Sequence, residues 1–242
     1  MKIPRIDRKI FKRIARRSKH EFNERILHPY LVRNKQKIFC IGQNKTGTTS
    51  LLKTFQDLKF IAARETQSAK LLDSYLEKDY DRIINFCKSA QVFEDVPFSL
   101  PELYKHLDKA FPHSKFILTV RDNPEQWYGS LVSFLSKLFG KGSIPTIEDF
   151  KNARYIEKGW AWRLFKETYN TDESDLFNKE ILIQKYIDHN NKVIEYFGNR
   201  ENLLVINLAE QGSYQKFCHF IGVKSEKNSF PWVHKTATMQ VR

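Results

Sequence analysis

Residues 38–50 of the chain read IFCIGQNKTGTTS and predict a phosphate-binding loop between a strand and a helix. A short apolar run leads into Gly42, Gly47 follows, and three hydroxyl residues come directly after it. In such a loop, backbone N–H groups and the N-terminus of the next helix face an anion. The alternative is an ordinary strand–turn–helix connection in which Ser and Thr only cap the helix.

The position of the lysine separates this loop from the loop that binds nucleoside triphosphates. That loop reads G-x-x-x-x-G-K-[ST], with the lysine directly after the second glycine. Here Thr48 occupies that position, and Lys45 comes two residues before Gly47. We therefore expect this loop to hold a phosphate but to suit a triphosphate with Mg²⁺ poorly.

The segment KTGTTS, residues 45–50, resembles the phosphosulfate-binding loop of the sulfotransferases. Their donor is 3′-phosphoadenosine-5′-phosphosulfate (PAPS), and their loop has a K-[ST]-G-T-[TK]-[SWT] core after a buried strand. The resemblance implies that Lys45 stabilises the charge that develops on the bridging oxygen of the donor. It also implies that no metal is needed and that the 5′-phosphate is bound by Lys45, Thr46, Gly47, Thr48, Thr49 and Ser50.

The 3′-phosphate of such a donor requires a second anion site. Residues 116–130, FILTVRDNPEQWYGS, resemble the family segment for this group, which reads R-D-P followed by a serine in the next helix. The resemblance gives these roles to Arg121 and Ser130, and the planar fork of an arginine can hold two phosphate oxygens at once. The alternative for Arg121 is a salt bridge to Asp122 or to another neighbour.

This chain departs from the family pattern by one residue, because it reads R-D-N-P. If Asn123 is taken up in the loop, Ser130 keeps its place relative to Pro124. A weaker resemblance near the C-terminus, in SFPWVHKTAT, makes Lys235 a further candidate for binding the donor.

The acceptor needs a base to take its proton. Cytosolic sulfotransferases place a histidine before a proline at the end of the second strand, and alignment of the prolines puts Asp95 at that position. Other branches of the superfamily use a carboxylate, so Asp95 is the candidate base and Glu94 the alternative. Because neighbouring side chains of a strand point to opposite faces, only one of the two is expected to line the site. The structural alternative is that Asp95 caps the strand or pairs with Lys45.

Apolar runs alternate with amphipathic segments along the chain, which predicts an α/β fold with a parallel sheet. With the resemblance, this becomes a three-layer, P-loop nucleotide-kinase-like sulfotransferase fold with helices on both faces. The ligand is then expected at the carboxyl ends of the strands, and the aromatic-rich residues 140–175 as an acceptor lid or pocket. The predicted strands are 38–41, 91–94, 116–120 and 203–207. The predicted helices are 48–59, 66–78, one capped by Ser99 and running to Ala110, 124–139 with Asn123 as its cap, 178–197, and one ending at Phe220.

Charge divides the chain into two parts. The net charge is +13, and residues 1–37 carry +10 of it, with 13 Lys and Arg against three acids, which leaves +3 for the remaining 205 residues. We predict a basic amphipathic N-terminal arm over 1–37, with Ile3, Ile6, Ile10 and Ile14 on one helical face, and a sulfotransferase domain over 38–242. The arm suits an anionic membrane surface, or it docks the isoleucine face on its own domain.

No apolar run reaches the length of a membrane-spanning helix, and no secretory signal is recognised. The three cysteines, Cys40, Cys87 and Cys218, lie in apolar contexts and are predicted to be buried thiols. We therefore expect a cytoplasmic protein, peripheral at a membrane if the arm docks there. No nucleic-acid partner and no metal site are expected.

The sequence thus predicts a PAPS-dependent sulfotransferase that moves a sulfuryl group by in-line displacement. Its acceptor is expected to be a hydroxyl or amine group of a small molecule, glycan or lipid. The alternatives are a P-loop kinase or nucleoside triphosphatase, and a non-catalytic, membrane-docking protein that retains a nucleotide fold.

Overall fold

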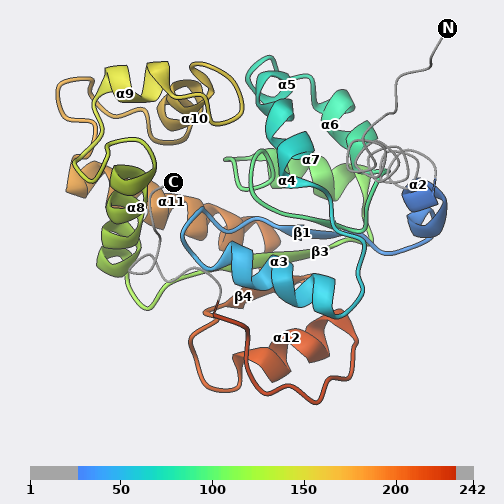
Figure 1. Ribbon diagram of the computed structural model, residues 1–242. Helices are drawn as coiled ribbons and strands as arrows, with labels where there is room; N and C mark the ends of the chain where they lie inside the picture. Colours follow the sequence, from blue (N-terminus) through green and yellow to red (C-terminus); the bar gives the residue numbers. More distant parts are fainter. Residues whose placement is uncertain (1–26, 233–242) are drawn as a thin grey trace, which may run out of the picture.

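The computed structural model describes residues 27–232 and shows a four-stranded sheet flanked by helices (Figure 1). The strands follow the order β2-β1-β3-β4 across the sheet, and all neighbours are parallel. This confirms the predicted α/β class with a parallel sheet. The strands are β1 (Ile38–Cys40), β2 (Val92–Phe93), β3 (Lys115–Thr119) and β4 (Leu203–Ile206).

Alternating side chains of the strands supply two cores, one on each face of the sheet. Ile38 and Cys40 belong to the core under α3 (Thr48–Asp57) and α12 (Ser213–Ile221). Phe39, between them, belongs to a larger core shared with α7 (Leu103–Ala110) and α11 (Lys179–Phe197). The central strands are therefore covered on both faces, as expected of a parallel sheet.

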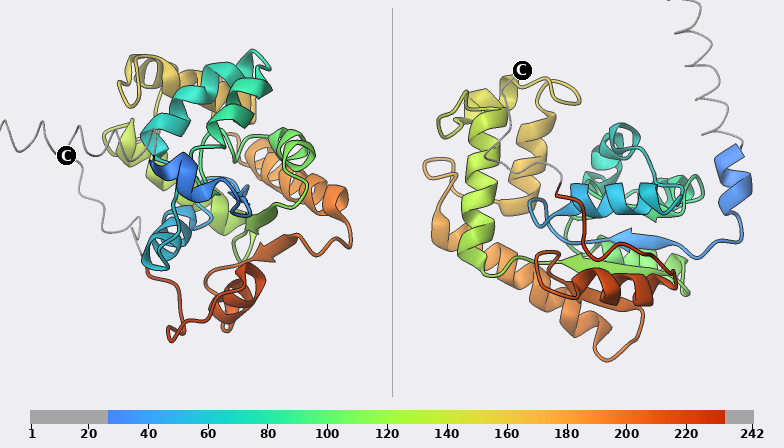
Figure 2. Two further views of the ribbon diagram at one scale, coloured as in Figure 1. Left: turned by 90° about the vertical axis from the view of Figure 1, so that its right-hand side faces the viewer. Right: turned by 60° about the horizontal axis from the view of Figure 1, so that its bottom comes forward.

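The other helices gather mostly at the two ends of the strands. Figure 2 shows α8 and α10 at the end opposite α2, with the sheet between them. The remaining helices are α2 (His28–Val32), α4 (Glu65–Ser68), η2 (Ala69–Leu71), α5 (Leu72–Leu76), α6 (Tyr80–Phe86), α8 (Pro124–Leu138), α9 (Ile147–Asn152) and α10 (Trp160–Tyr169).

Two helix predictions were wrong. The predicted helix 66–78 is interrupted by the 3₁₀ turn η2, where the carbonyl of Ala69 accepts from the backbone N–H of Leu72, in a 3₁₀ bond, and from the indole of Trp160 at 2.9 Å. Ser99 does not cap α7, because the helix begins only at Leu103, with Glu102 in the cap position. Ser99 lies in the preceding turn, where its N–H donates to the carbonyl of Asp95.

The other cap prediction at the sheet edge is confirmed. The Asn123 side chain accepts a hydrogen bond from the N–H of Gln126 at 2.8 Å, and Pro124 occupies the first turn of α8. All three cysteines are buried, as predicted. Across residues 27–232, every helix is too short or too polar to traverse a bilayer. Most of the predicted arm, with its isoleucine face, lies outside the described residues.

Candidate functional site

The loop between β1 and α3 turns tightly at two glycines. Gly47 has φ 103° directly before α3, and Lys45, two residues earlier, has φ 73°. A Cβ on Gly47 would lie 2.9 Å from Cδ1 of Leu208, and one on Gly42 would lie 2.2 Å from Oγ1 of Thr119. Glycine is thus required at both positions. The ten-residue helix α3 then presents its N-terminus, with its partial positive charge, at the end of the loop.

The Thr46 side chain stabilises the loop from inside. Its Oγ1 donates to the carbonyl of Gln43 at 2.6 Å and lies 2.6 Å from Oγ1 of Thr119 on β3. Thr46 is only 1% exposed. The Thr46 hydroxyl is therefore already engaged inside the loop. Of Thr46, which was predicted to bind the phosphate, only the backbone remains available to an anion.

The three residues after Gly47 differ in their surroundings. The Thr48 hydroxyl bonds the carboxyl group of Glu94, whereas Thr49 is exposed. Ser50 is buried in the first turn of α3, where its N–H donates to the Gly47 carbonyl at 3.0 Å. Among these three hydroxyl groups, that of Thr49 is the one best placed to reach an incoming anion.

Arg121, at the end of β3, directly contacts the loop. Its Nε donates to the carbonyl of Lys45 at 2.5 Å, and its backbone N–H donates to the hydroxyl of Tyr186 at 3.0 Å. Tyr186 stacks on Trp127 with ring centroids 4.5 Å apart, and the indole of Trp127 donates to the carbonyl of Asn44 at 3.0 Å. The structure thus brings the two predicted anion-binding segments into contact.

Asp122 is not the partner of Arg121. Its carboxylate instead accepts hydrogen bonds from Gln126, at 2.6 Å, and from Asn207. The extra residue Asn123 lies outside α8 as its cap, so Ser130 keeps its place relative to Pro124. Ser130 is half-buried one turn beyond Gln126, on the same side of the helix.

Both carboxyl groups after β2 face the loop, which corrects the expectation that only one would. The strand ends at Phe93, and Asp95 has φ 62°, so the alternation of a strand does not apply there. The carboxyl group of Glu94 bonds Thr48, and that of Asp95 bonds the Asn44 side chain. Asp95 also accepts a hydrogen bond from the N–H of Val96 at 2.9 Å.

Burial shifts the pKa values of the groups around the loop toward neutrality. Burial, with repulsion from Glu65, raises the pKa of Asp95 to about 6. Burial, followed by the charge of Asp95, holds the pKa of Glu94 well above its usual range. Burial, with the charge of Arg121, lowers the pKa of Lys45 to about 8. Such values are typical of groups that exchange protons at neutral pH.

The Lys45 ammonium group lies over the ring of Phe134, with its Nζ 3.7 Å from the ring centroid. This is a cation–π contact with α8. Among residues 27–232 Lys45 enters no salt bridge, so Asp95 does not hold Lys45 by one. The two opposite charges still attract, because each favours the charged form of the other.

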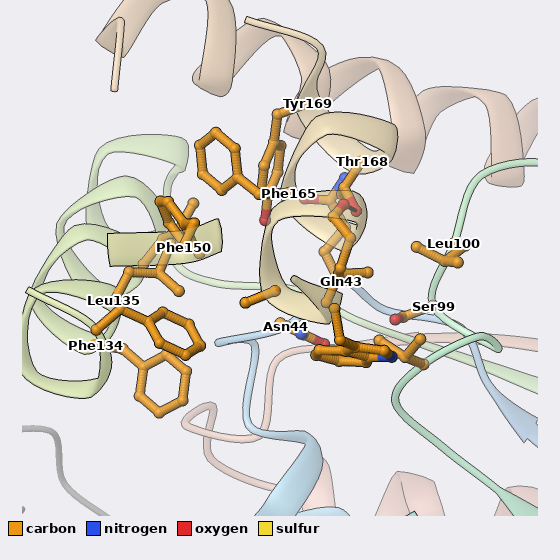
Figure 3. Close-up of a pocket in the computed structure, with 16 residues that line it drawn as sticks. Gln43, Asn44, Ser99, Leu100, Phe134, Leu135, Phe150, Phe165, Thr168 and Tyr169 are labelled. Carbon is orange, nitrogen blue, oxygen red and sulfur yellow. Dashed lines mark hydrogen bonds between the residues drawn. The ribbon is translucent and has the colours of Figure 1, made fainter. Parts of the chain in front are cut away.

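An apolar cavity of about 60 Å³ lies next to Lys45, and Phe134 is among the residues that line it (Figure 3). Gln43 and Asn44 of the loop line it together with α8, and the segment after Asp95 contributes Val96 and Ser99. The aromatic-rich stretch predicted to form an acceptor lid or pocket lines it too, with Phe150, Trp160, Ala161, Leu164, Phe165, Thr168 and Tyr169.

Several residues around the site could not be singled out from the sequence. His189 of α11 lies 2.9 Å from the carbonyl of Ile41 through its Nε2, and Trp127 and Tyr186 hold the loop from α8 and α11. The order of residues carries no signal for these contacts, which depend on how α8 and α11 pack.

The remaining candidate, Lys235, lies outside the described residues. Among residues 27–232, no three His, Cys, Asp or Glu side chains are grouped in a way that would hold a metal ion.

Comparison with known families gives one match that covers most of the chain. A family model described as a sulfotransferase domain matches residues 37–239. No curated protein matches the chain. The matched region begins directly before β1 and includes the loop, the two carboxyl groups and Arg121.

Proposed function

The chain belongs to the sulfotransferase family, and on that premise we propose that it transfers the sulfuryl group of PAPS to a hydroxyl or amine acceptor. The observation that carries the proposal is the contact between Arg121 and the loop, 2.5 Å from Nε to the carbonyl of Lys45. It supports a donor that carries anionic groups at two positions of one nucleotide. The start of the match at residue 37 supports a domain that begins near residue 38, after the basic arm.

The residues around the loop fit such a donor. The 5′-phosphosulfate would lie at the N-terminus of α3, within reach of Lys45 and the exposed Thr49. The 3′-phosphate would lie at Arg121 and Ser130, where an arginine can give two charge-assisted hydrogen bonds. Lys235 remains a proposed ligand of the same donor.

Asp95 and Lys45 would carry the chemistry. As the acceptor oxygen or nitrogen forms its bond to sulfur and the bond from sulfur to the phosphate oxygen breaks, Asp95 takes the acceptor's proton. Lys45 stabilises the negative charge that the phosphate oxygen gains. A pKa of about 6 leaves Asp95 mostly ionised at neutral pH, and a pKa of about 8 leaves Lys45 mostly protonated.

The alternative function, a P-loop kinase or nucleoside triphosphatase, is not favoured. The position of its lysine is taken by Thr48, whose hydroxyl bonds Glu94. The family match also points to sulfuryl transfer rather than to phosphoryl transfer.

Calorimetric titration with adenosine 3′,5′-bisphosphate (PAP) and with ATP tests the donor. We expect PAP to bind without Mg²⁺ and more tightly than ATP with Mg²⁺; the reverse order would overturn the proposal.

With labelled PAPS and an accepted substrate, Lys45→Ala should lower kcat by about 10²- to 10³-fold, as for the loss of one transition-state donor. Lys53→Ala, an exposed lysine of α3 that pairs with Asp57, is the matched control and should leave kcat unchanged.

A further inference from the structure

The ammonium group of Lys45 lies against an aromatic ring. Its Nζ is 3.7 Å from the centroid of the Phe134 ring, well inside the distance of about 6 Å at which a ring face attracts a cation. Phe134 is half-buried and packs against the larger core, which holds its ring in place. In the part of the chain that the structure describes, no carboxylate forms a salt bridge with this ammonium group.

Helix α8 determines where this ring lies. Trp127, Ser130 and Phe134 follow one another at spacings of three and four residues, so they lie on one side of the helix. Trp127 is fully buried, and its indole donates to the carbonyl of Asn44 at 3.0 Å. The same side of α8 therefore contacts the loop twice, at the backbone of Asn44 and at the side chain of Lys45.

The groups around Lys45 do not together favour its charged form. Burial and the charge of Arg121 lower the pKa of Lys45 to about 8, and the charge of Asp95, which raises it, is the smallest of the three influences. From α8, the group that faces the ammonium is the ring of Phe134. The face of such a ring carries partial negative charge and thus stabilises a cation.

A ring also differs from a carboxylate in what it leaves available. It carries no net charge and takes up none of the N–H groups of the ammonium in a strong hydrogen bond. A carboxylate at the same place would occupy at least one N–H group and would repel an anionic donor. An aromatic partner therefore suits a lysine that has to stay charged and still bind an anion.

We propose that Phe134 is a positioning residue for sulfuryl transfer, whose ring keeps the Lys45 ammonium group charged beside the loop without neutralising it. This inference rests on the proposed function. The N–H groups of the ammonium then remain available to the phosphate oxygen that gains charge as its bond to sulfur breaks.

Calorimetric titration of PAP at pH about 6.5 and pH about 8.5 tests this role without turnover. Phe134→Leu keeps an apolar side chain but removes the ring, so Lys45 should lose its charge at a pH that is lower by about 0.5–1.5. The variant should therefore bind PAP about three- to 25-fold more weakly than the unchanged protein at the higher pH, and within about twofold of it at the lower pH. The titration of PAP itself cancels in this ratio, because both proteins bind the same nucleotide. With labelled PAPS and an accepted substrate, the alkaline limb of kcat/KM should move to lower pH by the same amount.

Four further variants assign the effect to the ring. Phe139→Leu makes the same change at another residue that lines the cavity, while the ring under Lys45 is that of Phe134; its effect on PAP should be the same at both pH values. Phe134→Tyr keeps a ring face and should keep the alkaline limb in place. Replacement of Phe134 by 3,5-difluorophenylalanine keeps the shape of the ring but withdraws electrons from its face, so it should give part of the shift even if Phe134→Leu fails to fold. In a Lys45→Ala background, Phe134→Leu should have no further pH-dependent effect.

The outcomes separate the inference from the proposed function. If PAP binds and labelled PAPS gives a sulfated product, but Phe134→Leu weakens PAP equally at both pH values or not at all, the inference is overturned and the sulfotransferase function stands. If the unchanged protein binds no PAP and gives no product, the proposed function is overturned, and the inference with it. A loss confined to alkaline pH, shared by the fluorinated ring and absent from Phe139→Leu, supports both.

Discussion

Lys45 and Asp95 reach useful protonation states through the same physical cause acting in opposite directions. Burial disfavours a charge of either sign, so it lowers the pKa of the lysine to about 8 and raises that of the carboxyl group to about 6. Between these values both groups are mostly charged. In the mechanism proposed above, this state would let Asp95 accept a proton while Lys45 stabilises an anion.

We expect the pH profile of kcat/KM to be bell-shaped. Activity should fall below pH about 6, because Asp95 becomes protonated and no longer accepts the acceptor's proton. It should fall above pH about 8, because Lys45 loses the charge that stabilises the leaving oxygen. Initial rates with labelled PAPS at a low concentration of an accepted substrate give this profile.

Two variants test whether protonation of Asp95 causes the acidic limb of that profile. Asp95→Asn should lower kcat/KM by about 10²- to 10⁴-fold and remove the limb. Glu65→Gln should move the limb to lower pH, because repulsion from Glu65 contributes to the raised pKa of Asp95. An unchanged limb in Asp95→Asn would show that another group, with Glu94 the first candidate, is the base.

Arg121 offers a test that does not involve the chemical step. Arg121→Ala should weaken PAP by about ten- to hundredfold while adenosine 5′-phosphate loses much less, because only PAP carries the 3′-phosphate. Calorimetric titration gives, for each nucleotide, the ratio of the Kd of the variant to the Kd of the unchanged protein. Arg82→Ala, at an exposed position of α6, is the control and should change neither affinity. An equal loss for both nucleotides would mean that Arg121 only supports the loop through the Lys45 carbonyl.

The sequence could name these residues but not every contact between them. Lys45 and Arg121 were singled out through the loop pattern and the resemblance to the sulfotransferase segments, and the structure places the two in contact. That both carboxyl groups face the loop depends on the positive φ of Asp95, which nothing in FEDVP indicates. Likewise, the sequence could not show that the Thr46 hydroxyl is hydrogen-bonded to Thr119, which lies 73 residues away in the chain.

Among the helices and strands, local signals gave the right answer where no distant group competes with them. The cap at Asn123, followed by Pro124, was sufficient to predict where α8 begins. In contrast, the helical pattern over 66–78 gave no sign that Trp160 would take a carbonyl from its middle, 91 residues along the chain. Helix α6 was missed, although Asp79 caps it by accepting from the N–H of Arg82 at 3.1 Å.

The close approach of β1 and β3 gives a prediction for stability. Gly42→Ala should lower the free energy of unfolding by about 1–3 kcal/mol, because the new Cβ would lie 2.7 Å from the backbone N and O of Thr119 and 2.2 Å from its Oγ1. Gly129→Ala is the matched control: this helical glycine of α8 has open space around it, so alanine should stabilise by up to about 1 kcal/mol. Urea denaturation measures both, and equal effects would contradict the packing argument.

The described end of the basic N-terminal segment, with Arg33, Lys35 and Lys37, lies away from the proposed active site. Residues 1–37 hold +10 of the net +13, and the described end of this segment meets a basic groove of about 500 Å³ beside α2. Figure 2 shows α2 at the opposite end of the molecule from α8 and α10, which line the apolar cavity. The groove is lined by the basic residues Arg33, Lys35, Lys37, Lys88 and His113, among others.

We propose an anionic membrane surface as the partner of this end of the molecule. Next to the groove, α2 exposes Tyr30 (77%) and Leu31 (48%), which would enter the interface between headgroups and chains. A protein bound through this end would turn the apolar cavity toward the solvent.

We therefore expect the full chain to sediment with phosphatidylcholine vesicles that contain phosphatidylserine, and not with phosphatidylcholine alone. Each basic residue near the surface contributes about 1 kcal/mol, so the double variant Arg33→Glu and Lys35→Glu should reduce binding by more than tenfold. Reversal of Lys141 and Lys151, two exposed lysines at the other end of the molecule, is the control and should have little effect. Because the attraction is electrostatic, high salt should release the protein. Equal sedimentation with neutral vesicles, or equal loss in the control variant, would assign the basic arm to another role.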